Sequence, residues 1–173
     1  AGEFERHQET SVAGRSLRNP GLDVVTVAAG GGSILAVRDG RLQVGPGSAG
    51  AAPGPACYGR GGPLTVTDAN LVLGRIQADL FPRRFGADSN SGLDLAAAQQ
   101  ALARSCPTMD PDHAAAGFLA VANERMAAAT AQVSIARGHD PRQHALVAFG
   151  GAAGQHACAV AAQLGIEDHP TLH

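Results

Sequence analysis

The sequence predicts an α/β domain, and three features support this fold class. A run rich in β-branched residues, DVVTVA at 23–28, leads directly into a glycine cluster. A long alanine-rich stretch between Pro111 and Gly138 has the end signals of a helix. A short apolar run, ALVAF at 145–149, precedes a second glycine cluster. The 173 residues are enough for one compact domain with a single core.

The first part of the chain is expected to hold most of the strands. The polar segment 1–20 ends at a turn signal, Asn-Pro-Gly. A strand at 23–28 follows, and segments 34–38 and 42–44 flank Asp39-Gly40, the strongest short hairpin signal in the chain. We therefore predict the order strand, glycine loop, hairpin.

Residues 45–64 are crowded with glycine and proline. A flexible linker is one interpretation of this composition. However, the segment carries alanine, cysteine and tyrosine and contains no charge repeats, and it lies between two predicted structured elements. We predict an ordered loop with many special backbone angles.

Helices are predicted in the second half of the chain. One covers about 67–77, with Thr65 or Thr67 as its N-cap residue. A second covers 93–105 and is capped by Ser91 or Asp94.

The third helix runs from Asp110 to about Arg137. After it, 145–149 is predicted to be a strand buried inside a sheet. The last helix covers Gln155–Leu164, begins at about Gly154 and ends at Gly165.

Composition and charge argue against several classes of function. The net charge is −2 and the cations are scattered, so no basic stripe for nucleic acid is present. The sequence contains no apolar run long enough to span a bilayer and no recognisable signal peptide at its start. Three separated cysteines without a CxxC pair indicate neither a disulfide framework nor a structural zinc site, and we predict no metal ligands. A cytoplasmic location is expected.

The sharpest local signal is the strand–turn–helix unit ALVAFGGAAGQHA. Helix starts expose free N–H groups, so the turn is a candidate anion or nucleotide-edge site. A packing role for the glycines is an equally good interpretation. The turn lacks the Lys-Ser/Thr ending of a Walker loop, and it does not match the dinucleotide GxGxxG pattern. The candidate ligand-binding residues of this turn are Gly150, Gly151, Ala152, Gly154 and Gln155.

A second candidate site is the cluster Gly30, Gly31 and Gly32 followed by Ser33. Its backbone N–H groups and the hydroxyl could contact a ligand, whereas a tight strand connection is the ordinary alternative. Asp23, Ser33 and Asp68 are candidate catalytic residues, although a turn explains Asp23 and a helix cap explains Asp68 as well.

Two further side chains carry specific expectations. His156 is expected to be neutral, because a helix start lowers the pKa of its imidazole. Cys57 is expected to be a buried structural thiol, since only Arg60 is close in sequence as an activating cation.

Taken together, the motifs resemble the hydantoinase A/5-oxoprolinase family over nearly the whole chain. Within this family, the segments FPRRFG and GQHAC are most similar to the 5-oxoprolinase branch. The segments that carry the resemblance are TVAAGGGS, VGPGSAGAAPGPACYGRGGPLTVTDANLVLGRI, FPRRFG, GFLAVANERM and ARGHDPRQHALVAFGGAAGQHACAVAAQLGI.

This resemblance implies a partial actin-like ATPase domain over residues 1–173. The implied activity is the ATP-dependent opening of 5-oxo-L-proline, or a related lactam or hydantoin, to an amino acid, with Mg²⁺ and a monovalent cation. Two DxGGT-type phosphate loops of such folds are not found in this sequence, so we expect them upstream and expect the chain alone to be inactive. The implied partners are the remaining polypeptide or a partner subunit, and a homo-oligomer is compatible with the sequence.

Two positions depart from the family pattern. At position 25 this sequence has Val, where the family pattern is similar to Asn. At position 153 it has Ala, where the family pattern is similar to Gly, and such a position can require a positive φ. Two other hypotheses stay open beside the enzyme fragment. One is a nucleotide-binding or interaction module without turnover, and the other is a truncated remnant that still folds.

Overall fold

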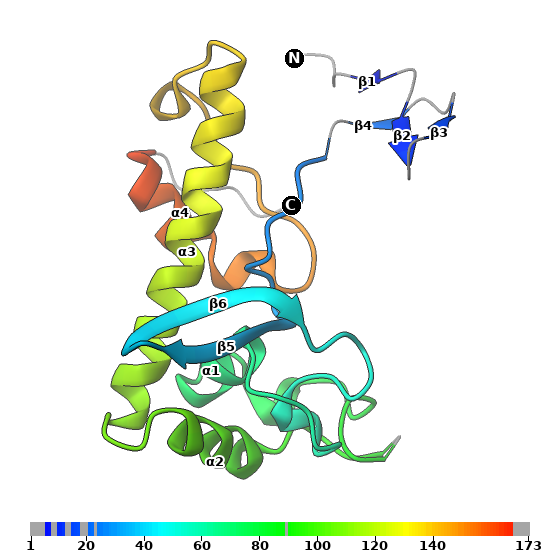
Figure 1. Cartoon of the computed structure of the whole chain (residues 1–173), viewed down its shortest axis with the longest axis vertical. Coiled ribbons are helices and arrows are strands. Elements are labelled where there is room, and N and C mark those ends of the chain that lie inside the picture. Colours follow the sequence, from blue (N-terminus) through cyan, green and yellow to red (C-terminus); the bar gives the residue numbers. More distant parts are fainter. Residues whose placement is uncertain are drawn as a thin grey trace.

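The computed structural model describes residues 6–7, 10–12, 15–17, 21–22, 24–88 and 90–167. The long helix α3 runs along the long axis of the molecule (Figure 1). A two-stranded hairpin crosses its lower half, α1 and α2 lie at its lower end, and α4 packs beside its upper half. The fold is therefore mixed α/β, as the sequence predicts.

Four short strands form antiparallel ladders before residue 23. The polar pattern of residues 1–20 did not indicate them. The pairs are β1 (Arg6–His7) with β4 (Gly21–Leu22), and β2 (Thr10–Val12) with β3 (Arg15–Leu17).

The predicted hairpin is confirmed as β5 (Ser33–Arg38) and β6 (Arg41–Ser48), which pair antiparallel. Asp39 and Gly40 both have positive φ, at 50° and 72°, as a two-residue type I′ turn requires. The strand predicted at 23–28 is wrong over its described part, because 24–28 forms no strand. Among the described residues, no strand pairs with this segment.

Part of the glycine- and proline-rich segment 45–64 is buried, as expected for an ordered loop, and its first four residues belong to β6. Residues 54–57 are buried, and the short 3₁₀ helix η1 (Ala56–Tyr58) forms in its centre. Helix α1 (Val66–Val72) follows, capped by Thr65 and not by Thr67. It ends five residues earlier than predicted, and the buried Ile76 lies after its end.

Of the two caps predicted for the second helix, Asp94 is confirmed, and the third helix begins where the sequence predicts. In α2 (Leu95–Ser105), the side chain of Asp94 accepts a hydrogen bond from the N–H of Ala97 at 2.9 Å. In α3 (Pro111–Ala136), Asp110 accepts from His113 N–H at 3.0 Å. Gly138 follows α3 with a φ of 75°. Between α1 and α2 lies the 3₁₀ helix η2 (Ala78–Leu80).

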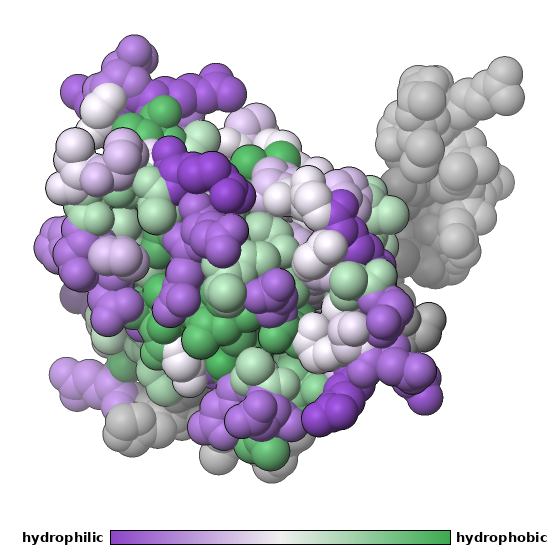
Figure 2. All heavy atoms as spheres, turned by 90° about the horizontal axis from the view of Figure 1, so that it is seen from below, coloured by the Kyte–Doolittle hydropathy of each residue, from purple (hydrophilic) through white to green (hydrophobic). Residues whose placement is uncertain are grey.

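The core lies where α1, α2 and the hairpin meet the lower half of α3. Phe118 and Leu119 of α3 are fully buried against small and branched side chains of the other elements. The abundance of alanine lets these elements approach closely. Viewed from the α2 end, apolar residues gather in the middle of the face and hydrophilic residues surround them (Figure 2).

The predicted buried strand at 145–149 is wrong. The segment forms no strand, and Val147 and Phe149 are 63% and 82% exposed. An apolar run becomes a buried strand only when other strands pair with it, and no described strand does so.

The last helix begins later than predicted. The 3₁₀ helices η3 (Pro141–Gln143) and η4 (Ala153–Gln155) precede α4 (Ala157–Leu164), and η4 occupies the predicted helix start. The predicted end is confirmed, because Gly165 has a φ of 69°. No helix among the described residues has the length and apolar character needed to cross a membrane.

Candidate functional site

The two predicted glycine clusters, about 120 residues apart in sequence, meet in the structure. A Cβ atom added to Gly31 would lie 3.9 Å from the Cβ of Ala152. Gly30 from the first cluster and Ala152 and Ala153 from the second line one groove of about 550 Å³, together with His156. We call this groove, whose walls also include 146–149 and two valines, the glycine groove.

The first glycine loop is fixed by α1 and the hairpin. The carbonyl of Gly31 accepts hydrogen bonds from the N–H of Thr67 at 2.9 Å and from its hydroxyl at 3.0 Å. Added Cβ atoms at Gly31 and Gly32 would lie 2.9 Å and 3.0 Å from the hydroxyl oxygens of Thr67 and Ser48. These two glycines are therefore needed for packing, whereas a Cβ at Gly30 would meet nothing within 4 Å. Ser33 is buried and begins β5.

The second loop is open. Added Cβ atoms at Gly150, Gly151 and Gly154 would meet nothing within 4 Å. Gly150 has a φ of 95°, a conformation that favours glycine. The N–H groups of Gln155 and His156 are already donated within η4, to the carbonyls of residues 152 and 153. The free N–H groups of α4 thus begin three residues beyond the predicted position, and anion binding at this turn stays a prediction.

His156 joins three helices at the floor of the glycine groove. Its side chain is 3% exposed, and its Nδ1 lies 2.7 Å from Oδ1 of Asn123 in α3. On the other side, Nδ2 of Asn70 in α1 lies 3.5 Å from Nε2 of His156 and donates to the carbonyl of Val66 at 3.2 Å. The buried Oδ1 of Asn70 has no hydrogen-bond partner among the described residues.

This arrangement assigns one protonation state to His156. Nδ1–H donates to Asn123, and the Nε2 lone pair faces the amide of Asn70. A proton on Nε2 would face the N–H of Asn70. Burial lowers the pKa of His156, and the guanidinium of Arg75 lowers it further. The expected neutral imidazole follows, but burial rather than the helix start is its main cause.

Asp68 is fully buried, and hydrogen bonds occupy its carboxylate. Oδ1 accepts from the N–H of Cys57 at 2.7 Å. Oδ2 accepts from the N–H of Ala56 at 3.2 Å, and from the N–H and hydroxyl of Thr65 at 2.7 and 2.9 Å. These contacts match the capping interpretation of Asp68. A catalytic role for it stays a prediction.

Comparison with known proteins agrees with the family resemblance that these motifs carry. The family model for hydantoinase/oxoprolinase matches residues 1–171. The chain belongs to the hydantoinase/oxoprolinase family. The 5-oxoprolinase PfmaA of Pestalotiopsis fici is 49% identical over 174 residues, which cover 96% of this chain and 14% of that relative.

Two solved structures contain a similar unit within longer chains. The ATP-dependent caprolactamase from Pseudomonas jessenii is 42% identical, with a TM-score of 0.73, and the match covers 87% of this chain and 22% of that one. A nucleotide-free acetone carboxylase is 23% identical, with a TM-score of 0.78, and the match covers 96% of this chain and 24% of that one. The second likeness concerns the fold alone.

The two departures from the family pattern lie at or next to the glycine groove. Ala153 begins η4 and does not have a positive φ, so its methyl group causes no backbone strain. Val25 lines the groove and is exposed. Asp23, the remaining catalytic candidate, lies outside the described residues.

Burial also determines the protonation state of the Cys57 thiol. Burial raises the pKa of its thiol far above the ordinary value, and the neighbouring carboxylate of Asp68 raises it further. The thiol is therefore protonated and is not an activated nucleophile, in line with the structural role predicted for it.

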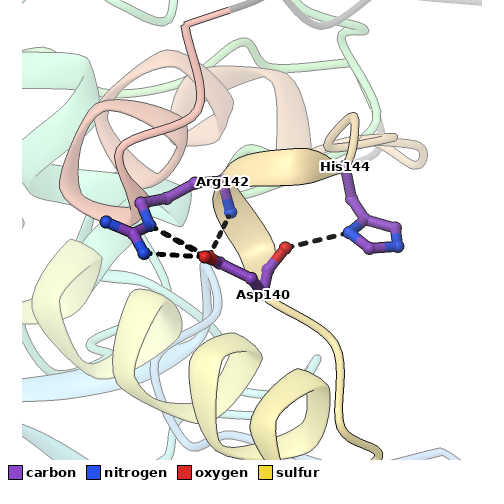
Figure 3. A network of polar contacts seen from close by, with 3 residues as sticks. All are labelled: Asp140, Arg142 and His144. Atoms are coloured by element: carbon purple, nitrogen blue, oxygen red, sulfur yellow. Dashed lines mark hydrogen bonds and ion pairs between the residues drawn. The ribbon is translucent and has the colours of Figure 1, made fainter.

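A second polar cluster lies before segment 145–149 and was not found from the sequence. The guanidinium of Arg142 forms a bidentate ion pair with Asp140, at 2.7 Å from Nη2 to Oδ2, and Nδ1 of His144 lies 2.9 Å from the carbonyl of Asp140 (Figure 3). Arg142 also lowers the pKa of Asp140 through these hydrogen bonds. These exposed contacts all lie within residues 140–144, in and next to η3.

Sequence reasoning also missed Asn123. The residue lies 33 positions before His156, within the GFLAVANERM segment, and no site role was assigned to it there. One usable signal exists: Asn123 is a polar residue on the apolar, alanine-rich side of α3, and a buried amide requires a partner.

Proposed function

We propose that this chain forms the nucleoside side of an ATP site in an ATP-dependent cyclic-amide hydrolase. The substrate class is 5-oxo-L-proline or a related lactam or hydantoin, which the reaction opens to an amino acid. The remaining polypeptide, or a partner subunit, supplies the phosphate loops, and the complete protein is cytoplasmic. The observation that carries the proposal is the meeting of the two glycine clusters at one groove.

The shape and lining of the glycine groove support a nucleoside. A volume of about 550 Å³ is typical of small-molecule sites. Gly30 presents backbone without a side chain, so the flat face of a base can approach closely. His156 presents a neutral imidazole at the floor, and Asn70 behind it keeps one unpartnered acceptor. An unpartnered buried acceptor costs about 1–3 kcal/mol, which favours a role beyond stability.

The family relationship supports the reaction class. A relative is named 5-oxoprolinase, and a similar solved structure is an ATP-dependent caprolactamase. In the proposed reaction, ATP transfers a phosphoryl group to the amide oxygen and ADP is released. Water attacks the activated ring carbon, the ring C–N bond breaks with the nitrogen leaving as an amine, and a second water releases phosphate. Mg²⁺, a monovalent cation and the actin-like ATPase fold enter the proposal through the family resemblance alone.

Calorimetric titration of the chain with ATP and Mg²⁺ tests the nucleoside site. We expect weak binding, with a Kd in the millimolar range or about −4 kcal/mol, because only base and ribose contacts are available to offset the entropy of association. Gly30→Val places an isopropyl group in the groove and is expected to weaken binding about tenfold or more. Gly151→Val tests the predicted ligand contact of the second loop, where residue 151 lies next to the groove lining and not in it.

Gly92→Val is the matched control. A Cβ at Gly92 also meets nothing within 4 Å, and Gly92 does not line the groove. Equal affinities of the Gly30 and Gly92 variants for ATP would place the nucleoside elsewhere and overturn the proposal.

A further inference from the structure

Two separate apolar clusters hold the two glycine loops. The first loop belongs to the main core, which contains Ala29, and the carbonyl of Gly31 accepts two hydrogen bonds from α1. The second loop leads into α4, which packs on α3 through a smaller upper cluster. The buried residues of this upper cluster are Ala127, Val160 and Leu164. The shape of the groove between the loops therefore depends on how the two clusters are placed along α3 (Figure 1).

A polar bridge joins the two clusters at α3. Asn123 lies between Ala122, the last buried residue of α3 in the main core, and Ala127 of the upper cluster. Its Oδ1 lies 2.7 Å from Nδ1 of His156, and Nε2 of the same ring lies 3.5 Å from Nδ2 of Asn70 in α1. All three polar side chains are buried. The imidazole is thus held between the main core and the helix that follows the second loop.

The position of His156 determines the position of the groove wall before it. Both ring nitrogens face protein amides, and the residue is only 3% exposed. Ala152 and Ala153, which line the groove, lie just before it in η4. The N–H of His156 donates to the carbonyl of Ala153 at 3.1 Å. A shift of the imidazole therefore moves these two wall residues with it.

Apolar packing alone defines the register of these helices poorly. The buried side chains of α3 and α4 near the bridge are mostly alanines, whose small side chains form shallow ridges. Hydrogen bonds are directional, and a buried polar contact can specify one arrangement among several of similar packing. The bridge is kept although Oδ1 of Asn70 has no partner among the described residues. These features favour a role in setting the geometry of the groove.

We propose that Asn123 is a positioning residue of the nucleoside site. Acting through His156, it holds the second glycine loop opposite the first, at the separation that admits a nucleoside. Asn123 itself does not line the groove. This inference rests on the proposed function, because it requires the glycine groove to bind the nucleoside of ATP.

The bridge requires a neutral imidazole. Nδ1–H donates to Asn123 while Nε2 faces an N–H of Asn70, so a second ring proton would point at that N–H. Among the described residues, the guanidinium of Arg75 is the charged group that acts on the ring, and the amide of Asn123 adds no charge. A carboxylate at position 123 would keep the acceptor but would favour the imidazolium. Asn123→Asp therefore separates the effect of geometry from that of charge.

An NMR titration of the chain with adenosine tests the proposal. Adenosine has no phosphate and stays uncharged near neutral pH. Asn123→Leu removes the acceptor while keeping a side chain of similar shape. We expect it to weaken adenosine binding about fivefold or more, because the binding-competent arrangement of the two loops is populated less.

Leu119→Val is the matched control for this substitution. Leu119 is buried in the main core one turn before Asn123 on the same helix. The control also removes buried contacts from α3, and we expect it to change adenosine affinity by less than about twofold. Equal affinities of the Asn123→Leu and Leu119→Val variants would overturn the proposal.

Asn123→Asp keeps the proposal testable if Asn123→Leu does not fold. We expect ¹⁵N NMR of the imidazole to show that the pKa of His156 rises above about 7 in this variant. Adenosine should then bind about fivefold more weakly at pH 6.5 than at pH 8, whereas the affinity of the unmodified chain changes less than about twofold. An imidazolium without a change in adenosine affinity would contradict the proposal.

Two further outcomes of these titrations are informative. If His156 stays neutral in Asn123→Asp, adenosine should bind as it does to the unmodified chain, because the acceptor is retained, and a loss of binding would count against the proposal. If the unmodified chain binds no adenosine, the proposed function fails and this inference fails with it. Binding that Gly30→Val weakens and both Asn123 variants leave unchanged would preserve the nucleoside site and overturn this inference alone.

Discussion

Asp68 connects the glycine- and proline-rich loop to the start of α1 through one buried carboxylate. Its four donors come from Ala56, Cys57 and Thr65. A carboxylate is suited to this position because it offers acceptors only, whereas an amide would turn its NH₂ group toward these donors. The local capping box could be predicted from the sequence, but the contacts with residues 56 and 57 could not.

Asp68→Asn is expected to destabilise the chain by about 3 kcal/mol, because buried hydrogen bonds to a charged acceptor are lost and donors are left unpaired. Urea unfolding followed by circular dichroism measures the change in the free energy of unfolding. Asp94→Asn is the control, since Asn caps an exposed helix start about as well as Asp and the expected change is below about 0.5 kcal/mol. Similar losses in both variants would contradict the role assigned to Asp68.

Thiol labelling at pH 8 should separate the three cysteines. Cys158 is exposed, whereas Cys57 and Cys106 are buried and burial raises the pKa of both thiols. Since the thiolate is the reactive form, we expect Cys158 alone to react quickly in the native chain and all three to react in denaturant. Mass spectrometry of the labelled peptides checks this. Rapid labelling of Cys57 in the native chain would contradict the burial and the protonated state of its thiol.

At the scale of elements, His156 joins α1, α3 and α4 through Asn70 and Asn123. Its pKa is lowered in the folded chain, chiefly by burial. Below the unfolded value of 6.5, the unfolded state takes up a proton that the folded state does not, so stability falls as pH falls through this value. Above it, the neutral form prevails in both states and stability is fully present.

The free energy of unfolding is therefore expected to fall between pH 7 and pH 5.5, by at most about 1.4 kcal/mol per pH unit from this one proton. His156→Gln removes the titrating group, and its stability should depend less on pH over the same range. Denaturant titrations of both proteins at several pH values provide the measurement. Identical pH slopes would mean that His156 is not held neutral by the fold.

A further prediction concerns the close packing of the loop between β6 and α1. A Cβ at Gly62 would lie 1.8 Å from the carbonyl oxygen of Gly54, so the backbone must move to accept any side chain there. Gly62→Ala is expected to lower the free energy of unfolding by at least about 2 kcal/mol. Gly92→Ala, with open space around it, is expected to change it by less than about 1 kcal/mol. Equal effects would indicate a mobile linker.

Short sequence motifs correctly predicted the turns and helix ends that are determined by residues close together in the sequence. Asp39-Gly40 specifies its own turn, and Asp94 and Asp110 cap helices within three residues. Segment 145–149 failed as a buried strand because burial depends on partners distant in sequence. The approach of Gly31 to Ala152 is likewise set by packing across about 120 residues, so the sequence indicated two glycine sites and the structure joined them.

At the scale of the whole molecule, the chain matches only a small share of its relatives' length, 14% of the Pestalotiopsis fici 5-oxoprolinase. The glycine groove lies beside segment 145–149, which forms no strand with any of the described residues. On the proposed function, only the nucleoside side of the ATP site lies within these residues.

This arrangement gives an expectation for activity. The isolated chain should release no glutamate from 5-oxo-L-proline in the presence of ATP and Mg²⁺. Phosphoryl transfer depends almost entirely on positioning the metal and the triphosphate, and the DxGGT-type segments expected to do so are not in this sequence. The measurement is a glutamate-release assay with coupled detection of ADP. A chimera in which this chain replaces the matching segment of the Pestalotiopsis fici 5-oxoprolinase is the positive control, and Gly30→Val within it should reduce turnover more than Gly92→Val. Robust turnover by the isolated chain would show that these 173 residues hold a complete active site.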